Sequence, residues 1–136
     1  MTVVREEWMA LRSQEDVVGV RQAVRRWAVE AGFSLVDQTK VVTAASELAR
    51  NAVIYGGGGT AQIQRLADPN GRVGLRLTFE DKGPGIPNID QAMKDGFTTG
   101  SGLGLGLSGA KRLSNEFEIY SRVGEGTRVA ITRWKP

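Results

Sequence analysis

The chain has 136 residues, enough for one domain that buries roughly two-thirds of the surface of its unfolded form. Hydrophobic residues make up 40% and charged residues 24% of the sequence, which is typical of a soluble globular protein, and the formal net charge is +3. The absence of cysteine and histidine excludes disulfide bonds, thiolate nucleophiles and metal sites built on either residue, so acid–base or metal chemistry must use carboxylates, amides, hydroxyls and lysines.

The positive charge does not follow a nucleic-acid-binding pattern. Arg21, Arg25 and Arg26 lie close together, but Glu15 and Asp16 belong to the same segment, and no platform of interleaved aromatic and basic residues is present. We interpret this segment as a solvated helix face. No apolar stretch reaches the roughly 18 residues that a membrane span needs, and the N-terminus lacks a signal-peptide pattern. We therefore expect a cytoplasmic protein that binds neither nucleic acid nor membrane.

The first half of the chain predicts one strand and two helices. Residues 2–8 are short and β-branched, which predicts an edge strand. Residues 13–16 resemble a capping box, and the helix that they open is predicted to end in a left-handed cap at Gly32. Residues 34–37 repeat the capping pattern. The second helix then runs to the four glycines at 56–59, because consecutive glycines destabilise a helix.

The second half of the chain predicts four strands and two helices. Strands at 61–66 and 73–80 flank an Asn70–Gly71 step, which favours a hairpin turn. The later elements are a short helix, a third long helix and two strands, at 89–94, 105–115, 117–122 and 127–134. This order predicts a single-domain α/β sandwich over 1–136, with a mixed, largely antiparallel sheet of about five strands and three main helices on one face.

Three polar or glycine-rich segments are candidates for a functional site, and the first lies on the second predicted helix. Glu47 and Asn51 are four residues apart, so they share one helix face. A carboxylate and an amide oxygen are ligands that Mg²⁺ prefers. The carboxylate could instead orient or deprotonate a hydroxyl. Taken alone, the pair is typical of a solvated helix face.

The second segment, residues 81–87, directly follows a predicted strand. A carboxylate at a strand end, here Asp81, can accept a hydrogen bond from the exocyclic amine of adenine. Gly83 and Gly85 would let a flat ring approach the backbone without a Cβ in the way. The alternative is a plain Gly/Pro-rich turn, in which Asp is a favoured first residue.

The third segment, residues 100–109, is a glycine loop that leads into a predicted helix. Exposed amides of such a loop favour phosphate oxygens. Residues 104–109 match the dinucleotide fingerprint G-x-G-x-x-G, but no core strand precedes them and no βαβ unit follows. A P-loop is excluded because no Gly-Lys-Ser/Thr is present. The alternative is a flexible loop, against which the regularly spaced leucines argue.

In this order and spacing, the three segments resemble the N, G1 and G2 boxes of the GHKL ATPase superfamily, whose members share the Bergerat ATP-binding fold. Residues 124–127 agree, since they resemble the G-x-G-T of the same superfamily. Within it, the Glu-Leu-Ala-Arg-Asn of residues 47–51 and the extended third box resemble the anti-sigma regulatory serine/threonine kinases, and more closely their RsbT-type switch-kinase branch of the bacterial stressosome.

The resemblance implies ATP and Mg²⁺ as cofactors and a role for each matching position. Asn51 would coordinate Mg²⁺, Glu47 would act as general base, and Asp81 would bind adenine. Gly83, Gly85 and Thr127 would support Asp81. The positions that the resemblance assigns to the phosphates are Gly102, Leu103, Gly104, Leu105, Gly106 and Lys111. Residues 98–101 lack the lid arginine of many anti-sigma relatives, so Lys111, Arg50 or the partner would supply that cation.

The branch phosphorylates serine or threonine on STAS-domain proteins and then binds and activates a phosphatase, so the resemblance implies those partners. Three alternatives stay open. The chain could be an anti-sigma factor that sequesters a sigma subunit, a non-catalytic binding module gated by nucleotide, or an unattached sensor-kinase ATPase acting on a histidine in trans. Glu47 distinguishes the kinase from the binding module, because only the kinase needs that carboxylate.

Overall fold

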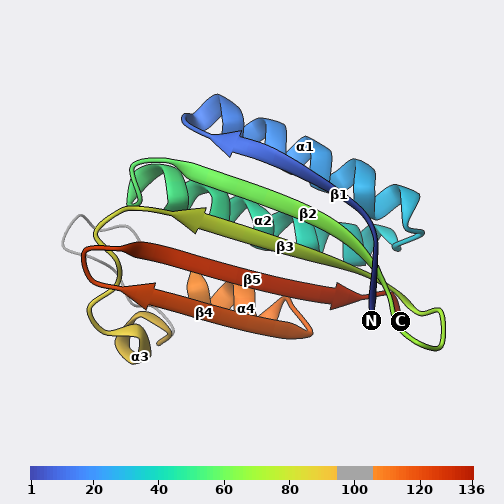
Figure 1. Ribbon diagram of the computed structural model, residues 1–136. Coiled ribbons are helices and arrows are strands. Elements are labelled where there is room, and N and C mark those ends of the chain that lie inside the picture. The colour runs from blue at the N-terminus through green and yellow to red at the C-terminus, as the bar shows by residue number, and fades with distance from the viewer. Residues whose placement is uncertain (95–105) are drawn as a thin grey trace.

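The computed structural model describes residues 1–94 and 106–136, and these form one sheet with helices on one side (Figure 1). The strands are β1 (Thr2–Leu11), β2 (Gly59–Ala67), β3 (Val73–Asp81), β4 (Glu116–Arg122) and β5 (Gly126–Trp134). The helices are α1 (Gln14–Glu30), α2 (Leu35–Ile54), α3 (Ile89–Ala92) and α4 (Leu107–Arg112). The predicted five-stranded α/β sandwich is therefore confirmed.

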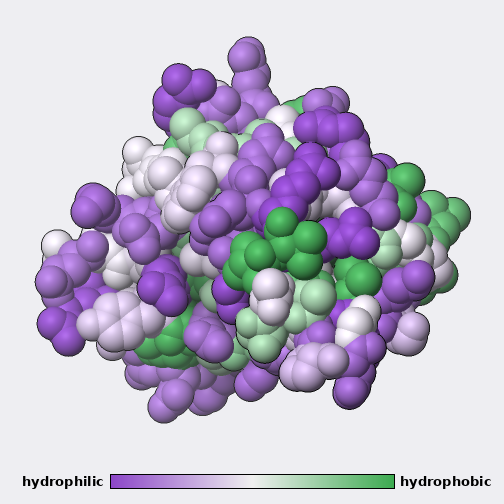
Figure 2. Space-filling view, turned by 45° about the vertical axis from the view of Figure 1, so that its right-hand side comes forward, coloured by the Kyte–Doolittle hydropathy of each residue, from purple (hydrophilic) through white to green (hydrophobic). Residues whose placement is uncertain are grey.

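The sheet has the strand order β1-β2-β3-β5-β4, and each of its four pairings is antiparallel. The expected mixed character is thus absent from the described sheet, because β4, which runs parallel to β3, lies beside β5 and not beside β3. Side chains alternate along β3: Leu77 and Phe79 are buried under the helices, whereas Glu80 is exposed on the other face. That open face is mainly hydrophilic in the view of Figure 2, with small separate hydrophobic areas.

The two long helices form because their apolar residues recur at helical spacing. On α1 the buried stripe is Val17, Val20, Ala23, Val24, Trp27 and Ala28, and α2 buries a matching stripe against the sheet. The predicted cap of α2 is confirmed, since the Ser34 hydroxyl accepts the N–H of Asp37 at 3.1 Å. At α1, Ser13 makes no side-chain cap bond, and the Asp16 carboxylate accepts the backbone N–H of Arg12 at 2.8 Å instead.

Two predicted details of the local structure have different outcomes. The left-handed cap at Gly32 is confirmed by its φ of +82°. The third helix is shorter than the predicted 105–115: α4 begins at Leu107 and its C-cap is Leu113. Directly after it, the hydroxyl of Ser114 donates to the carbonyl of Ala110 at 2.7 Å, and such local bonds compete with helix continuation.

One end of the molecule collects segments that are far apart in the sequence. The turn after α2, the end of β3 and the turn between β4 and β5 lie together at the end of the sheet opposite the two termini (Figure 1). In this way the antiparallel strand pairing brings residues near 56, 81 and 126 to the same end of the sheet.

Candidate nucleotide site

Asp81 ends β3 with its side chain half-buried on the helix side of the sheet. The backbone N–H of Gly83 donates to its Oδ1 at 2.9 Å. Burial raises the pKa of the Asp81 carboxyl, and the backbone N–H groups of Gly83 and Thr127 oppose that rise by hydrogen bonding to the charged form. A half-buried carboxylate held by its own backbone loop fits the recognition of a flat ligand that carries an N–H donor.

The end of α2 packs directly against this carboxylate because residue 56 is glycine. A Cβ at Gly56 would lie 2.5 Å from Asp81 Cβ and 2.6 Å from Asp81 Oδ2, closer than real side chains approach. A Cβ at Gly83 would lie 2.6 Å from the Cα of Gly56. The Gly56 N–H donates to the carbonyl of Asn51 at 3.2 Å. The turn that follows the first predicted segment therefore packs against the second segment, at the side chain of Asp81 and at the backbone of Gly83.

Glu47 and Asn51 lie one turn apart on α2 and are both half-buried, as their shared helix face predicts. The start of α4 approaches Glu47: a Cβ at Gly106 would lie 2.5 Å from Glu47 Oε2. Gly106 has a φ of +65°, a conformation that glycine adopts without strain. The described end of the third segment thus meets the first segment at Glu47.

These contacts bring together Glu47, Asn51, Asp81, Gly83 and Gly106 from the three segments. The remaining phosphate positions, Gly102, Leu103, Gly104 and Leu105, lie outside the described residues.

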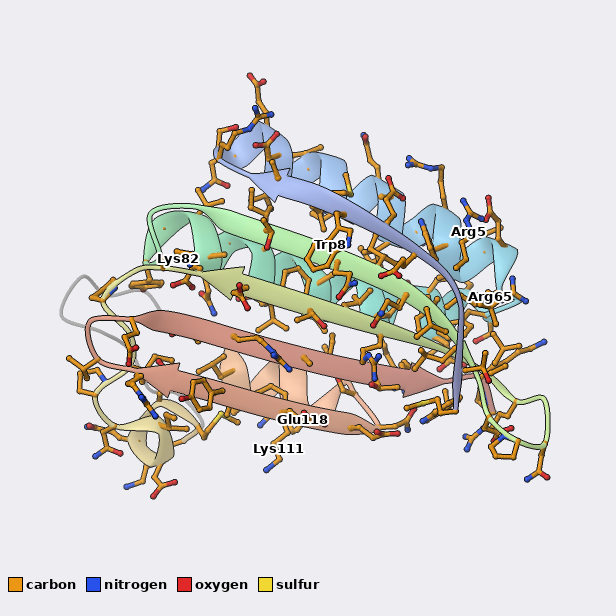
Figure 3. The ribbon with its side chains drawn as sticks, in the orientation of Figure 1. Arg5, Trp8, Arg65, Lys82, Lys111 and Glu118 are labelled. Atoms are coloured by element: carbon orange, nitrogen blue, oxygen red, sulfur yellow. The ribbon has the colours of Figure 1, made fainter. Side chains whose placement is uncertain are left out.

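Lys111 and Arg50, the two residues expected to supply a cation to the phosphates, are placed differently. Lys111 is exposed and projects beyond the β4 edge of the sheet in Figure 3, away from the strands. Arg50 is also exposed, but its Nη1 lies 4.0 Å from Glu47 Oε1. Lys82 follows Asp81 and lies at the site end of the sheet (Figure 3). Of these positively charged residues, Arg50 is the one whose contact with Glu47 favours a place near a transferred phosphate.

Ser121 was not singled out from the sequence, yet it joins the two turns beside Asp81. Its Oγ accepts the N–H of Ile86 at 2.8 Å, donates to the carbonyl of Gly126 at 3.1 Å and lies 2.7 Å from Thr127 Oγ1. The hydroxyl of Thr127 is therefore directed at Ser121, and its backbone supports Asp81. The sequence signal that could have identified Ser121 is a polar residue at a position of β4 that faces the helix side of the sheet.

Gly85 is fixed by the same two turns. Its φ is +79°, and a Cβ there would collide with the carbonyl of Arg122 at the end of β4. Glycine at this position therefore serves the packing of the loop against β4, in addition to any approach by a ligand.

A separate hollow of about 230 Å³ opens at this end of the sheet, and Asp81 and Thr127 form part of its wall. Its other lining residues include Glu80, Tyr120 and Arg128, which belong to the open face. It therefore lies on the other side of the sheet from Glu47 and Asn51, and we do not assign the nucleotide to it.

Comparison with known proteins decides the family. Residues 36–135 match the family described as histidine kinase-, DNA gyrase B- and HSP90-like ATPases. The chain belongs to this family. The match covers all three predicted segments and every element from α2 to β5, so the GHKL resemblance is confirmed.

Relatives of this GHKL chain cover nearly its whole length. It is 48% identical over 124 residues to the serine/threonine-protein kinase RsbT of Bacillus subtilis, a match that covers 91% of this chain and 92% of the relative. It is 30% identical over 120 residues to an anti-sigma F factor of Anoxybacillus flavithermus, covering 83% and 80%. The RsbU and RsbW domains of Rv1364c from Mycobacterium tuberculosis have the same fold, with a TM-score of 0.67 and 22% identity over 98% of this chain and 34% of that one.

The donor set fits a Mg²⁺–nucleotide complex better than a metal held by protein alone. Within residues 1–94 and 106–136, no three acidic side chains come together to hold a metal ion. Mg²⁺ in nucleotide sites is commonly held by one or two protein oxygens and by the phosphates, and the side-chain oxygen of Asn51 is suited to be one of these ligands.

None of the helices in the described parts of the chain combines the length and apolar character that crossing a membrane requires.

Proposed function

We propose that this chain is a cytoplasmic, ATP- and Mg²⁺-dependent serine/threonine protein kinase that phosphorylates a STAS-domain regulatory protein in a bacterial partner-switching stress pathway. The observation that supports it best is geometric. Asp81, suited to adenine, packs against the turn that ends α2, and Glu47, suited to a general base, lies on the same helix against the start of α4. A nucleotide lying along α2 would have its base at Asp81 and its terminal phosphate toward Glu47.

In the proposed reaction Glu47 orients the acceptor hydroxyl and takes its proton as the hydroxyl oxygen bonds to the terminal phosphorus. The bond from that phosphorus to the bridging oxygen breaks, and ADP leaves. Asn51 contributes an oxygen ligand to Mg²⁺, which supplies positive charge to the phosphates. Asp81 accepts the exocyclic N–H of adenine, and partial burial of this carboxyl raises its pKa.

The identity of the partner is proposed from the relatives. The 48% identical Bacillus subtilis protein is named a serine/threonine-protein kinase, and the match covers nearly all of both chains. This similarity favours a STAS-domain acceptor, followed by binding and activation of a phosphatase, over transfer to a histidine. The placement of Glu47 also favours a catalytic role over a nucleotide-gated binding module, because a pure binder needs no carboxylate beside the start of α4.

The test is incubation of the chain with Mg²⁺, labelled ATP and individual STAS-domain proteins, followed by mapping of the labelled residue. We expect label on a serine or threonine of one STAS-domain protein. Glu47→Gln should reduce transfer by about 100- to 10,000-fold, the usual contribution of a general base, and should leave ATP affinity unchanged. The matched control is Glu118→Gln, which removes an exposed carboxylate from β4 (Figure 3) and should transfer at the wild-type rate.

The outcomes separate the candidate functions. Full transfer by Glu47→Gln would refute the assignment of the base. ATP binding without transfer to any protein would support the binding module instead.

An anti-sigma factor is the second candidate, because an anti-sigma F factor is 30% identical over most of this chain. The two roles differ in the protein that stays bound. Pull-down with a sigma factor and with STAS-domain proteins, each with and without ATP, distinguishes them. Retention of the sigma factor in the ATP-bound state, without retention or labelling of a STAS-domain protein, would favour the anti-sigma role.

A further inference from the structure

A basic groove lies between the two long helices, outside the nucleotide site. It is lined by Val18, Arg21, Gln22, Arg25, Arg26 and Val42, encloses about 510 Å³, and is called here the α1–α2 groove. Its α1 side chains are mostly exposed, whereas the sheet-facing residues of α1 are buried. The groove therefore opens on the solvent side of the helix layer. Figure 1 shows that this layer covers the face of the sheet opposite its open face.

Two of the three acidic residues of α1 are paired away from this groove. Asp16 pairs with Arg12 at 3.0 Å, and Glu30 pairs with Arg5 on β1 at 3.0 Å. The third, Glu15, lies in the first turn of α1 and is not among the residues that line the groove.

Among the residues that the structure describes, no ion pair involves Arg21, Arg25 or Arg26. Of the three, Arg25 donates a side-chain hydrogen bond, from Nη1 to Gln38 Oε1 at 3.4 Å. Like charges four residues apart on a helix repel one another, so this arrangement lowers stability unless an acidic ligand compensates for it.

The floor of the groove indicates the kind of ligand. Val18 on α1 is 46% exposed and Val42 on α2 is buried, and both line the groove together with the three arginines, so its lining combines apolar and basic side chains. Guanidinium groups bind carboxylates through paired hydrogen bonds, which favours an acidic segment with one apolar side. A nucleic acid fits less well, because the lining residues include no aromatic side chain on which bases could stack.

The groove reaches α2 at Val42, on the same helix as Glu47. Val42 precedes Glu47 by five residues, which is about 7.5 Å along the helix axis. Helical spacing places Thr39, Thr43 and Arg50 on the side of α2 between these two positions, and all three are exposed. A protein seated in the groove could therefore extend over α2 and present a hydroxyl to Glu47.

We propose that the α1–α2 groove docks an acidic, amphipathic segment of the protein that accepts the phosphate. The proposal rests on the proposed kinase function and names the surface through which the acceptor is recognised. The three arginines bind carboxylates of the acceptor, and the valines receive an apolar side chain from it. Docking at this distance from the bound nucleotide governs acceptor affinity and leaves nucleotide affinity unaffected.

The experiment compares Arg21→Glu and Arg26→Glu with the control Arg128→Glu, which changes another exposed arginine, on the open face of the sheet. Each variant is assayed with Mg²⁺-ATP and the STAS-domain protein labelled by the wild type. We expect each groove variant to raise the KM for that protein by about tenfold, with kcat and the Kd for ATP unchanged. The control should keep the wild-type KM. A wild-type KM in both groove variants, or an equal rise in the control, overturns the proposal.

Failure of the proposed function would be seen separately, as the absence of label on every STAS-domain protein. The groove is then tested by calorimetric binding of the same STAS-domain proteins, and of a short DNA duplex, to the three variants. Binding of a STAS-domain protein that is lost in the groove variants and kept in Arg128→Glu supports acidic docking. Absence of any such binding, or binding of the duplex alone, overturns it.

Discussion

The contact between Gly56 and Asp81 allows a sharp test of the adenine site. Gly56→Ala adds one methyl group at a residue whose φ is not positive, so the backbone itself accepts alanine. The new Cβ would lie 2.5 Å from Asp81 Cβ and 2.6 Å from Oδ2, so the carboxylate must move. Overpacking of this kind costs about 1–3 kcal/mol. A displaced charged hydrogen bond costs about 1.5–3 kcal/mol, which corresponds to roughly 10- to 150-fold weaker ATP binding.

The matched control is Gly57→Ala, one residue further along. Gly57 has a φ of +73°, and a Cβ there meets no atom within 4 Å, so this variant strains the backbone without touching Asp81. Calorimetric titration with ATP measures affinity, and thermal unfolding verifies that both variants fold. We expect Gly57→Ala to be less stable and to bind ATP normally, and Gly56→Ala to bind weakly. Equal ATP affinity in Gly56→Ala and the wild type would refute the assignment of Asp81 to the adenine pocket.

Two further predictions concern carboxylates whose pKa is shifted in opposite directions. Arg133 and Ser34 lower the pKa of Asp37, so its stabilisation is present above the unfolded pKa of about 3.9 and is lost as pH falls through the folded value. Asp37→Asn should therefore reduce the free energy of unfolding by roughly 3 kcal/mol at pH 7 in urea titrations, and by much less in acid. Burial raises the pKa of Asp81, so ionisation destabilises the fold as pH rises. Asp81→Asn should raise the Tm at pH 7 but not at pH 3, while it abolishes ATP binding; an unchanged Tm at pH 7 would contradict this.

The elements that the sequence predicted best are those with a strong local signal. The Asn70–Gly71 turn, the Ser34 cap and the left-handed cap at Gly32 each depend on neighbouring residues, and each appears in the structure. The contacts of Gly56 and Ser121 could not be predicted, because each joins segments that only the strand order brings together. In the sequence alone, a glycine after a helix indicates only where that helix ends. Its contact with a carboxylate 25 residues later appears only once β2 and β3 are paired.

The resemblance to the N, G1 and G2 boxes predicted which segments come together, but not the contacts between them. The carboxylate of Glu47 adjoins the start of α4, and the adenine-side carboxylate of Asp81 adjoins the turn after α2. From Glu47 to the last residue of α2, Ile54, the helix rises about 10 Å, so in the proposed binding mode one rigid element would set the separation between the two ends of the nucleotide. In the proposed binding mode, affinity and transfer would therefore depend on different glycine contacts, Gly56 for the base and Gly106 for the phosphate end. Changes at these two glycines should separate in the kinetics, because the helix between them does not need to move.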